Sequence, residues 1–186
     1  GLLHDIGKPF LQRKSGKMYG HDILGAAMVQ DILGAKGLKF DHKTVEKVAL
    51  LVRNHMYDLD NRAKPSTVRK KFIRLGLDRA RDLILLRRAD QKASGLPLGE
   101  PPMIEKWERV LEELEEGRIP LSMKDLRISG WDIMEITGQG ASKKIGRMKQ
   151  ALFDWVIDHP EDNDPAVLRQ KLREFVERDR KARHRD

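Results

Sequence analysis

Apolar residues recur at intervals of three and four along most of the chain, as in residues 23–33 and 45–52. No segment sustains the alternation of apolar and polar residues that is typical of a half-buried strand. The pattern therefore predicts an all-α fold. We expect helices to begin near residues 1, 20, 41, 66, 78, 101, 122, 130, 142 and 165.

Glycine and proline interrupt this periodicity at residues 94–102, where they favour turns or extended backbone. We place a linker there and predict two units, a helical bundle at residues 1–96 and a smaller helical domain at residues 97–186. At the helix ends, Ser66 and Asp78 are predicted N-caps, and Gly76 is expected to close a helix in a left-handed conformation. Residues 178–186 have no apolar anchors, so we expect a disordered tail.

The positive charge is concentrated in the first half of the chain. The 186 residues have a formal net charge of +8. Residues 1–90 hold 19 basic and 10 acidic side chains, and residues 91–186 hold 18 and 19. Such a local excess indicates a surface that faces a polyanion such as RNA, although a solvated helix face gives the same pattern. The candidates for RNA contact in this half are Lys64, Arg69, Lys70, Lys71, Arg74, Arg87 and Arg88.

Composition limits the setting of the protein. The chain has no cysteine, which excludes disulfides and thiolate metal sites and fits the reducing cytoplasm. No apolar run approaches the length that crosses a bilayer, so we expect no membrane partner. The chain begins at Gly1 without a signal-peptide pattern, and we expect its natural N-terminus to lie upstream. No feature of the sequence specifies an oligomeric state.

The adjacent pair His4-Asp5 lies between apolar residues and a Gly-Lys-Pro break. Imidazole together with carboxylate suits borderline divalent cations, and such a site can polarise phosphate or activate water. His21, His55 and Asp90 follow, each next to a predicted helix. Any one of them alone is compatible with a capping or solvated residue, and a lone histidine beside an apolar face is more often packed than a ligand, but the ordered set predicts a shared site for a divalent metal ion. Manganese, iron, cobalt, nickel and zinc suit these ligands, and magnesium suits them less well.

Taken together, these motifs resemble the C-terminal region of bacterial CCA-adding tRNA nucleotidyltransferases and the related poly(A) polymerases, whose HD domain belongs to the HD phosphohydrolase superfamily. The resemblance covers nearly the whole chain. It is carried by residues 2–9, Gly20-His21-Asp22, the helix end at His55, and residues 85–90, 120–126, 128–134, 138–140, 144–146 and 156–164.

The resemblance implies metal-dependent hydrolysis of 2′,3′-cyclic or terminal phosphates. We expect His4, Asp5 and Asp90 to hold one cation, with His21 and His55 available for a second cation or for the phosphate. We name His4, Asp5 and Lys8 as catalytic candidates, and Lys8 would steady a phosphate oxygen.

Two features of the family are missing from the chain. The polymerising head has a Gly-Ser turn followed by an Asp-x-Asp pair on a strand, whereas Asp58-Leu59-Asp60 follows a helix end and is better explained as an Asp-rich turn. The superfamily also uses a histidine one helix before the doublet, which would lie upstream of Gly1.

A glycine-rich turn, Gly138-Gln139-Gly140, precedes a predicted helix start. Exposed amides at a helix N-terminus can hold a phosphate, and Lys143 and Lys144 add charge there. The spacing fails the P-loop pattern. Two interpretations stay open: a contact with the tRNA backbone, and a simple turn capped by Ser142.

Three functions are compatible with the sequence. We favour a part of a CCA-adding enzyme in which a metal-binding HD domain and a helical tail grip tRNA. The alternatives are a stand-alone HD phosphohydrolase of nucleotides and a catalytically silent RNA-binding module. We do not expect this chain to incorporate CTP or ATP by itself.

Overall fold

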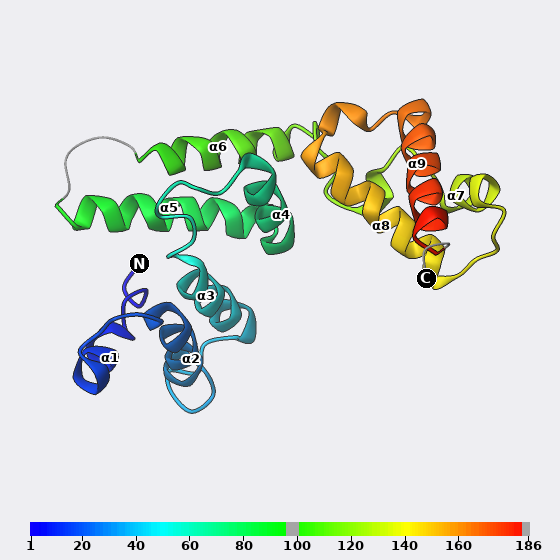
Figure 1. Ribbon diagram of the computed structural model, residues 1–186. Coiled ribbons are helices and arrows are strands. Elements are labelled where there is room, and N and C mark those ends of the chain that lie inside the picture. Colours follow the sequence, from blue (N-terminus) through cyan, green and yellow to red (C-terminus); the bar gives the residue numbers. More distant parts are fainter. Residues whose placement is uncertain (96–100, 184–186) are drawn as a thin grey trace.

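The computed structural model describes residues 1–95 and 101–183, and every regular element in those ranges is a helix (Figure 1). The predicted all-α class is confirmed. The elements are α1 (Lys8–Ser15), α2 (His21–Leu33), α3 (His42–Asn54), α4 (Pro65–Leu75), α5 (Leu77–Ala93), α6 (Pro102–Glu115), the 3₁₀ turn η1 (Met123–Asp125), α7 (Gly130–Thr137), α8 (Lys143–Asp158), the 3₁₀ turn η2 (Pro160–Asp162) and α9 (Pro165–Arg183).

Most elements begin within two residues of the predicted starts, but the first one does not. Residues 1–7 form successive turns in which the His4 amide donates to the Gly1 carbonyl and the Ile6 amide to the Leu3 carbonyl. α1 begins only at Lys8, with a proline in its first turn, where a missing amide hydrogen removes no helical hydrogen bond. Residues 4 and 5 therefore lie on turns and not on a helix.

Three predicted helix ends differ from the structure. Because Pro65 occupies the first position of α4, Ser66 lies inside the first turn and Lys64 is the N-cap. Gly76 does have a positive φ, but its backbone (φ 85°, ψ 144°) lies outside the left-handed helical region. The same glycine is the N-cap of α5, so Asp78 lies in the first turn and makes no capping bond.

Three buried clusters hold the helices together. α2 and α3 pack through the first, which includes Val29 and Val52. α4, α5 and α6 surround Trp107, which is fully buried and stacks on Tyr57 with ring centroids 5.6 Å apart. The third cluster joins α7, α8 and α9 around residues such as Leu152.

The domain boundary at residues 96/97 stays a prediction. Within the predicted linker, residues 96–100 lie outside the described part of the chain. α6 follows that boundary but shares its core with α4 and α5 and lies along α5 (Figure 1). This packing favours a division after Ile119, the last buried residue of that core.

The tail that we expected to be disordered is largely helical. α9 continues to Arg183, and residues 184–186 lie outside the described part. The Lys144 ammonium of α8 lies 2.8 Å from the Asp179 carboxylate of α9. This ion pair, together with residues of good helix propensity, supports the last turns where apolar anchors are lacking. Among the described helices, none is long and apolar enough to span a membrane.

Candidate metal centre

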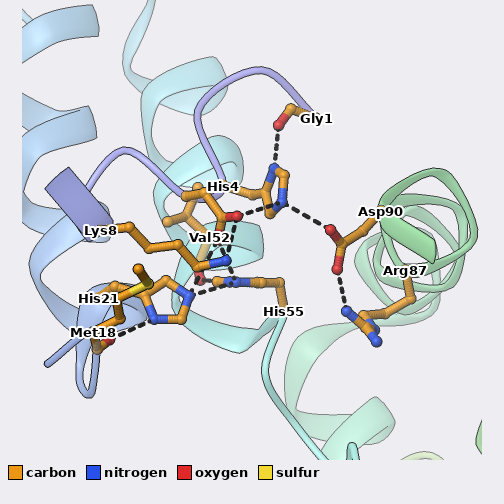
Figure 2. A network of polar contacts seen from close by, with 10 residues as sticks. Gly1, His4, Lys8, Met18, His21, Val52, His55, Arg87 and Asp90 are labelled. Carbon is orange, nitrogen blue, oxygen red and sulfur yellow. Dashed lines mark hydrogen bonds and ion pairs between the residues drawn. The ribbon is translucent and has the colours of Figure 1, made fainter. Parts of the chain in front are cut away.

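The five predicted ligand residues come together from four segments of the chain. His4 and Asp5 lie on the turns before α1, His21 is the first residue of α2, His55 directly follows α3, and Asp90 lies near the end of α5. Figure 2 shows His4, His21, His55 and Asp90 pointing toward a common centre. Their role as metal ligands stays a prediction, but residues up to 86 positions apart do converge.

Asp5 occupies the middle of this cluster. Its Oδ1 lies 3.2 Å from His21 Nε2 and 3.5 Å from His55 Nε2. Its Oδ2 lies 3.3 Å from His4 Nε2 and 2.5 Å from Lys8 Nζ. One carboxylate therefore connects all three imidazoles and the lysine.

Asp90 extends the cluster on the side of α5. Its Oδ1 lies 3.1 Å from His4 Nε2, and its other oxygen accepts a hydrogen bond from Arg87. Asp5 thus belongs to two potential ligand sets, one with His21 and His55 and one with His4 and Asp90. Within each set the ligand atoms lie within 4.8 Å of one another.

The orientation of each histidine ring is set by a backbone carbonyl. A carbonyl oxygen can only accept a hydrogen bond, so each Nδ1 must carry the hydrogen. In the neutral ring the lone pair is then on Nε2, the atom that faces Asp5 or Asp90. The Nδ1 atoms of His4, His21 and His55 donate to the carbonyls of Gly1, Met18 and Val52 over 2.5, 2.9 and 2.6 Å.

This arrangement fits a bound cation. The Nε2 atoms of His21 and His55 lie 3.1 Å apart, and two lone pairs at that distance repel unless a positive charge lies between them. Asp5 Oδ1 is buried and accepts no hydrogen bond from the described residues. A buried acceptor without a partner is costly, so three electron-pair donors directed at one point indicate a cation site.

The pKa values of the central groups favour the forms that bind metal. Burial lowers the pKa of His55 below its usual value of 6.5, which keeps this imidazole neutral. Burial alone would raise the pKa of Asp5, but the hydrogen bond from Lys8 and the positive charge of that lysine act in the opposite direction, and the pKa is lowered overall. A histidine binds a metal ion as neutral imidazole, and an aspartate binds it as ionised carboxylate. The lowered pKa values of His55 and Asp5 therefore both favour metal binding.

Several basic residues that we predicted to contact RNA form ion pairs with acidic residues of the same chain. Arg69 donates to Glu113 at 2.8 Å and to the Ile157 carbonyl at 3.1 Å. Lys70 lies 3.1 Å from Asp158. Arg87 bonds to Asp90, and Arg88 lies 2.7 Å from Glu108.

The remaining candidates in this stretch lie on α4. Lys64 is its N-cap, Arg74 lies in its last turn, and Lys71 is half-buried with its ammonium 5.1 Å from the centre of the Tyr57 ring. Part of the excess positive charge of the first half is therefore neutralised by ion pairs within the protein. Contact with RNA stays a prediction for all seven residues.

The glycine-rich turn joins α7 to α8. Gly138 is the left-handed C-cap of α7, and its amide donates to the Met134 carbonyl. Gly140 has nothing within 4 Å of the position of an added Cβ. Ser142 is the N-cap of α8 by position, but its side chain makes no capping bond, so that part of the turn interpretation is wrong. Lys143 is exposed at the start of α8, whereas its neighbour Lys144 is paired as described above.

Asp58-Leu59-Asp60 forms a turn, in agreement with the sequence interpretation. Asp58 accepts from the Ala63 amide at 2.7 Å and lies 2.7 Å from Lys106 Nζ. Both oxygens of the Asp58 carboxylate thus have partners, one in the turn and one on α6.

Gly7 is a site residue that the sequence reasoning missed. A Cβ at this position would lie 2.5 Å from the His21 carbonyl oxygen and 3.0 Å from the Gly25 amide nitrogen. The segment that carries Asp5 can approach α2 this closely only because residue 7 is glycine. The available signal in the sequence was a glycine two positions after the predicted ligand Asp5.

Comparison with known proteins agrees with this geometry. Residues 1–93 match the HD domain family. The chain is 31% identical over 159 residues to a CC-adding tRNA nucleotidyltransferase of Thermus thermophilus, and the match covers 82% of this chain and 34% of that protein. The chain thus spans about a third of the length of this relative. No solved structure gives a significant match. Because the HD match takes in half of the chain and all five converging residues, the chain belongs to the HD-domain family and is related to tRNA nucleotidyltransferases.

Proposed function

We propose that the chain is a metal-dependent phosphohydrolase that acts on 2′,3′-cyclic or terminal phosphates and serves as part of a tRNA nucleotidyltransferase. The observation that carries the proposal is the convergence of three Nε2 lone pairs on Asp5, whose Oδ1 is buried without a hydrogen-bond donor. His4, Asp5 and Asp90 would hold one cation, and Asp5, His21 and His55 a second one.

When bound, a divalent cation lowers the pKa of coordinated water and neutralises charge on phosphoryl oxygens, so no protein nucleophile is required. The residues of the chain supply the rest. Lys8 is about one-third exposed beside Asp5, from where its ammonium can reach a phosphate oxygen. Arg87 fixes the orientation of the Asp90 carboxylate, and the three backbone carbonyls fix the imidazoles.

Removal of a central ligand tests this function. We expect Asp5→Asn or His21→Ala to lose bound Mn²⁺ and to slow hydrolysis of adenosine 2′,3′-cyclic phosphate by about 100-fold or more, because even partners of metal ligands contribute 10- to 100-fold. Metal content is measured by mass spectrometry of the loaded protein, and hydrolysis by chromatography of the product.

His42→Ala is the matched control. This histidine is exposed at the start of α3 and belongs to neither ligand set. Its variant should keep the metal content and turnover of the parent chain. Full turnover in either ligand variant would contradict the proposed mechanism.

Binding of tRNA is the second part of the proposal, and the relationship to a tRNA nucleotidyltransferase supports it. Lys143, which is exposed at the start of α8, is one candidate contact that forms no ion pair among the described residues. Metal-dependent hydrolysis that neither needs nor responds to tRNA would favour the stand-alone phosphohydrolase. Binding of tRNA by a chain that takes up no metal would favour the silent RNA-binding module.

A further inference from the structure

A pocket of about 640 Å³ opens beside the metal centre, on the side of His21 and Lys8. Its volume lies in the range of small-molecule binding sites. His21 belongs both to the pocket wall and to the ligand cluster, so a molecule in the pocket lies next to the centre. The wall is completed by Met18, Tyr19, Gly20, Asp22, Ile23 and Met56.

Large apolar side chains gather around this pocket although they are exposed. The exposed fractions are 47% for Met18, 96% for Tyr19, 56% for Ile23 and 39% for Met56. Single exposed apolar residues are common, but four around one pocket indicate a binding surface. An aromatic ring and two thioethers suit a flat, polarisable ligand.

The loop that presents these residues is tied to the metal centre. The Met18 carbonyl accepts the hydrogen bond from His21 Nδ1 over 2.9 Å, and Gly20 adopts a left-handed conformation (φ 82°) that turns the chain into α2. Figure 2 shows Met18, His21 and Lys8 together on one side of the cluster, opposite Asp90 and Arg87. The position of Tyr19 is therefore coupled to that of His21.

Charge distinguishes this pocket from its neighbour across the centre. A second pocket, of about 520 Å³, borders His4 and is lined by apolar residues such as Leu3, by Asp82 and by no lysine or arginine. An anionic substrate is favoured on the side where Lys8 supplies positive charge. Of the two pockets, the one that Tyr19 borders is thus the one whose wall includes a lysine that could contact a phosphate.

We propose that this pocket holds the base of a nucleoside phosphate whose phosphate group lies at the metal centre. The inference rests on the proposed function and narrows its substrates to nucleotides or RNA ends, as opposed to phosphoesters without a base. Tyr19 and the neighbouring methionines offer faces for the ring. Asp22, whose carboxylate makes no ion pair among the described residues, would accept a hydrogen bond from an amino group of the base or from a ribose hydroxyl.

Substitution of Tyr19 in the Mn²⁺-loaded chain tests the pocket by binding as well as by turnover. We expect Tyr19→Ala to raise the Kd of adenosine 2′-monophosphate in calorimetry about tenfold, within the usual contribution of one stacked base. The kcat/KM for adenosine 2′,3′-cyclic phosphate should fall equally, while that for glycerol 1,2-cyclic phosphate, which has no base, stays unchanged. Tyr19→Phe keeps the ring and should remain within about twofold of the parent.

Trp131→Ala is the matched control, because Trp131 is an aromatic residue that is 80% exposed on α7, outside the pocket. An unchanged Kd in Tyr19→Ala, or equal losses with the base-free ester, would overturn the inference. Binding that depends on Tyr19 without any hydrolysis would support the pocket and contradict the proposed function. An oligoribonucleotide that ends in a cyclic phosphate shows whether the ligand is an RNA end or a free nucleotide. If it binds more strongly than the mononucleotide, and in a Tyr19-dependent way, the ligand is an RNA end. If the two bind equally, the ligand is a free nucleotide.

Discussion

At the scale of single residues, the geometry of the centre depends on the lack of a side chain at Gly7. The Gly7 backbone lies directly against the His21 carbonyl, one residue from Lys8 and two from Asp5. A methyl group here would have to displace the backbone of α2, because the nearest atoms are all backbone atoms and none belongs to a flexible side chain. The distance between Asp5 and His21 is therefore set in part by a glycine.

We expect Gly7→Ala to weaken Mn²⁺ affinity by about 10- to 100-fold, the range found when groups that position metal ligands are removed. The forced shift of the turn from α2 should also lower the melting temperature. Calorimetric titration with Mn²⁺ and thermal unfolding measure the two effects. Gly130→Ala, where an added Cβ meets nothing within 4 Å, is the control, and unchanged affinity in Gly7→Ala would contradict the role of close approach.

The convergence of the predicted ligand residues could be inferred from the sequence because imidazole and carboxylate residues stand at the ends of recognisable helices, where side chains of different helices meet. The role of Gly7 could not be found in the same way, because it depends on where α2 passes. Arg87 shows the same limit. Its charge was visible in the sequence, but its ion pair with Asp90 was not.

At the scale of elements, helix caps show which serines fix a helix start. The Ser129 side chain accepts from the Asp132 amide at 3.1 Å, and Asp132 accepts in return from the Ser129 amide at 2.8 Å. Asp132 also pairs with Arg169, which ties α7 to α9. Ser142 has no such bond at α8.

We expect Ser129→Ala to lower the free energy of unfolding by about 1 kcal/mol, the usual contribution of an N-cap. Ser142→Ala is a matched control at the neighbouring helix and should change it by less than about 0.5 kcal/mol. Urea denaturation followed by circular dichroism measures both. Equal effects of the two substitutions would show that the reciprocal bonds contribute nothing.

The element starts were predictable from periodicity, but the caps were only partly so. The reciprocal pattern requires an acidic residue three positions after the serine. Ser129 has Asp132 there, whereas Ser142 is followed by Ile145 and Ser66 by Arg69. Serine before an apolar run was therefore an incomplete signal.

At the scale of the whole molecule, α4 joins the two halves of the chain. Ile73 of α4 packs against both the Trp107 core and the core of α7 to α9. Beside it, Arg69 bridges Glu113 of α6 and the last turn of α8. Formal charge along the sequence gave no indication of this role, because the partners lie 44 and 88 positions away.

We expect Arg69→Ala to lower the free energy of unfolding by about 1–3 kcal/mol, less than for a fully buried pair because Arg69 and Glu113 retain some exposure. Lys70→Ala, on the adjacent and more exposed pair with Asp158, should cost less than about 1 kcal/mol. Chemical denaturation compares the two. A larger loss in Lys70→Ala would contradict the bridging role of Arg69.

The three backbone carbonyls that hold the imidazoles have a common spacing. Each belongs to the residue three positions before its own histidine, so every ring is oriented inside a four-residue unit of local chain. The conformational entropy of each ring is thus lost when its own unit forms. Assembly of the centre then requires only that these preformed units pack together. As a consequence, changes in a loop outside these units, such as the one between α2 and α3, leave the orientation of each ring within its own unit unchanged.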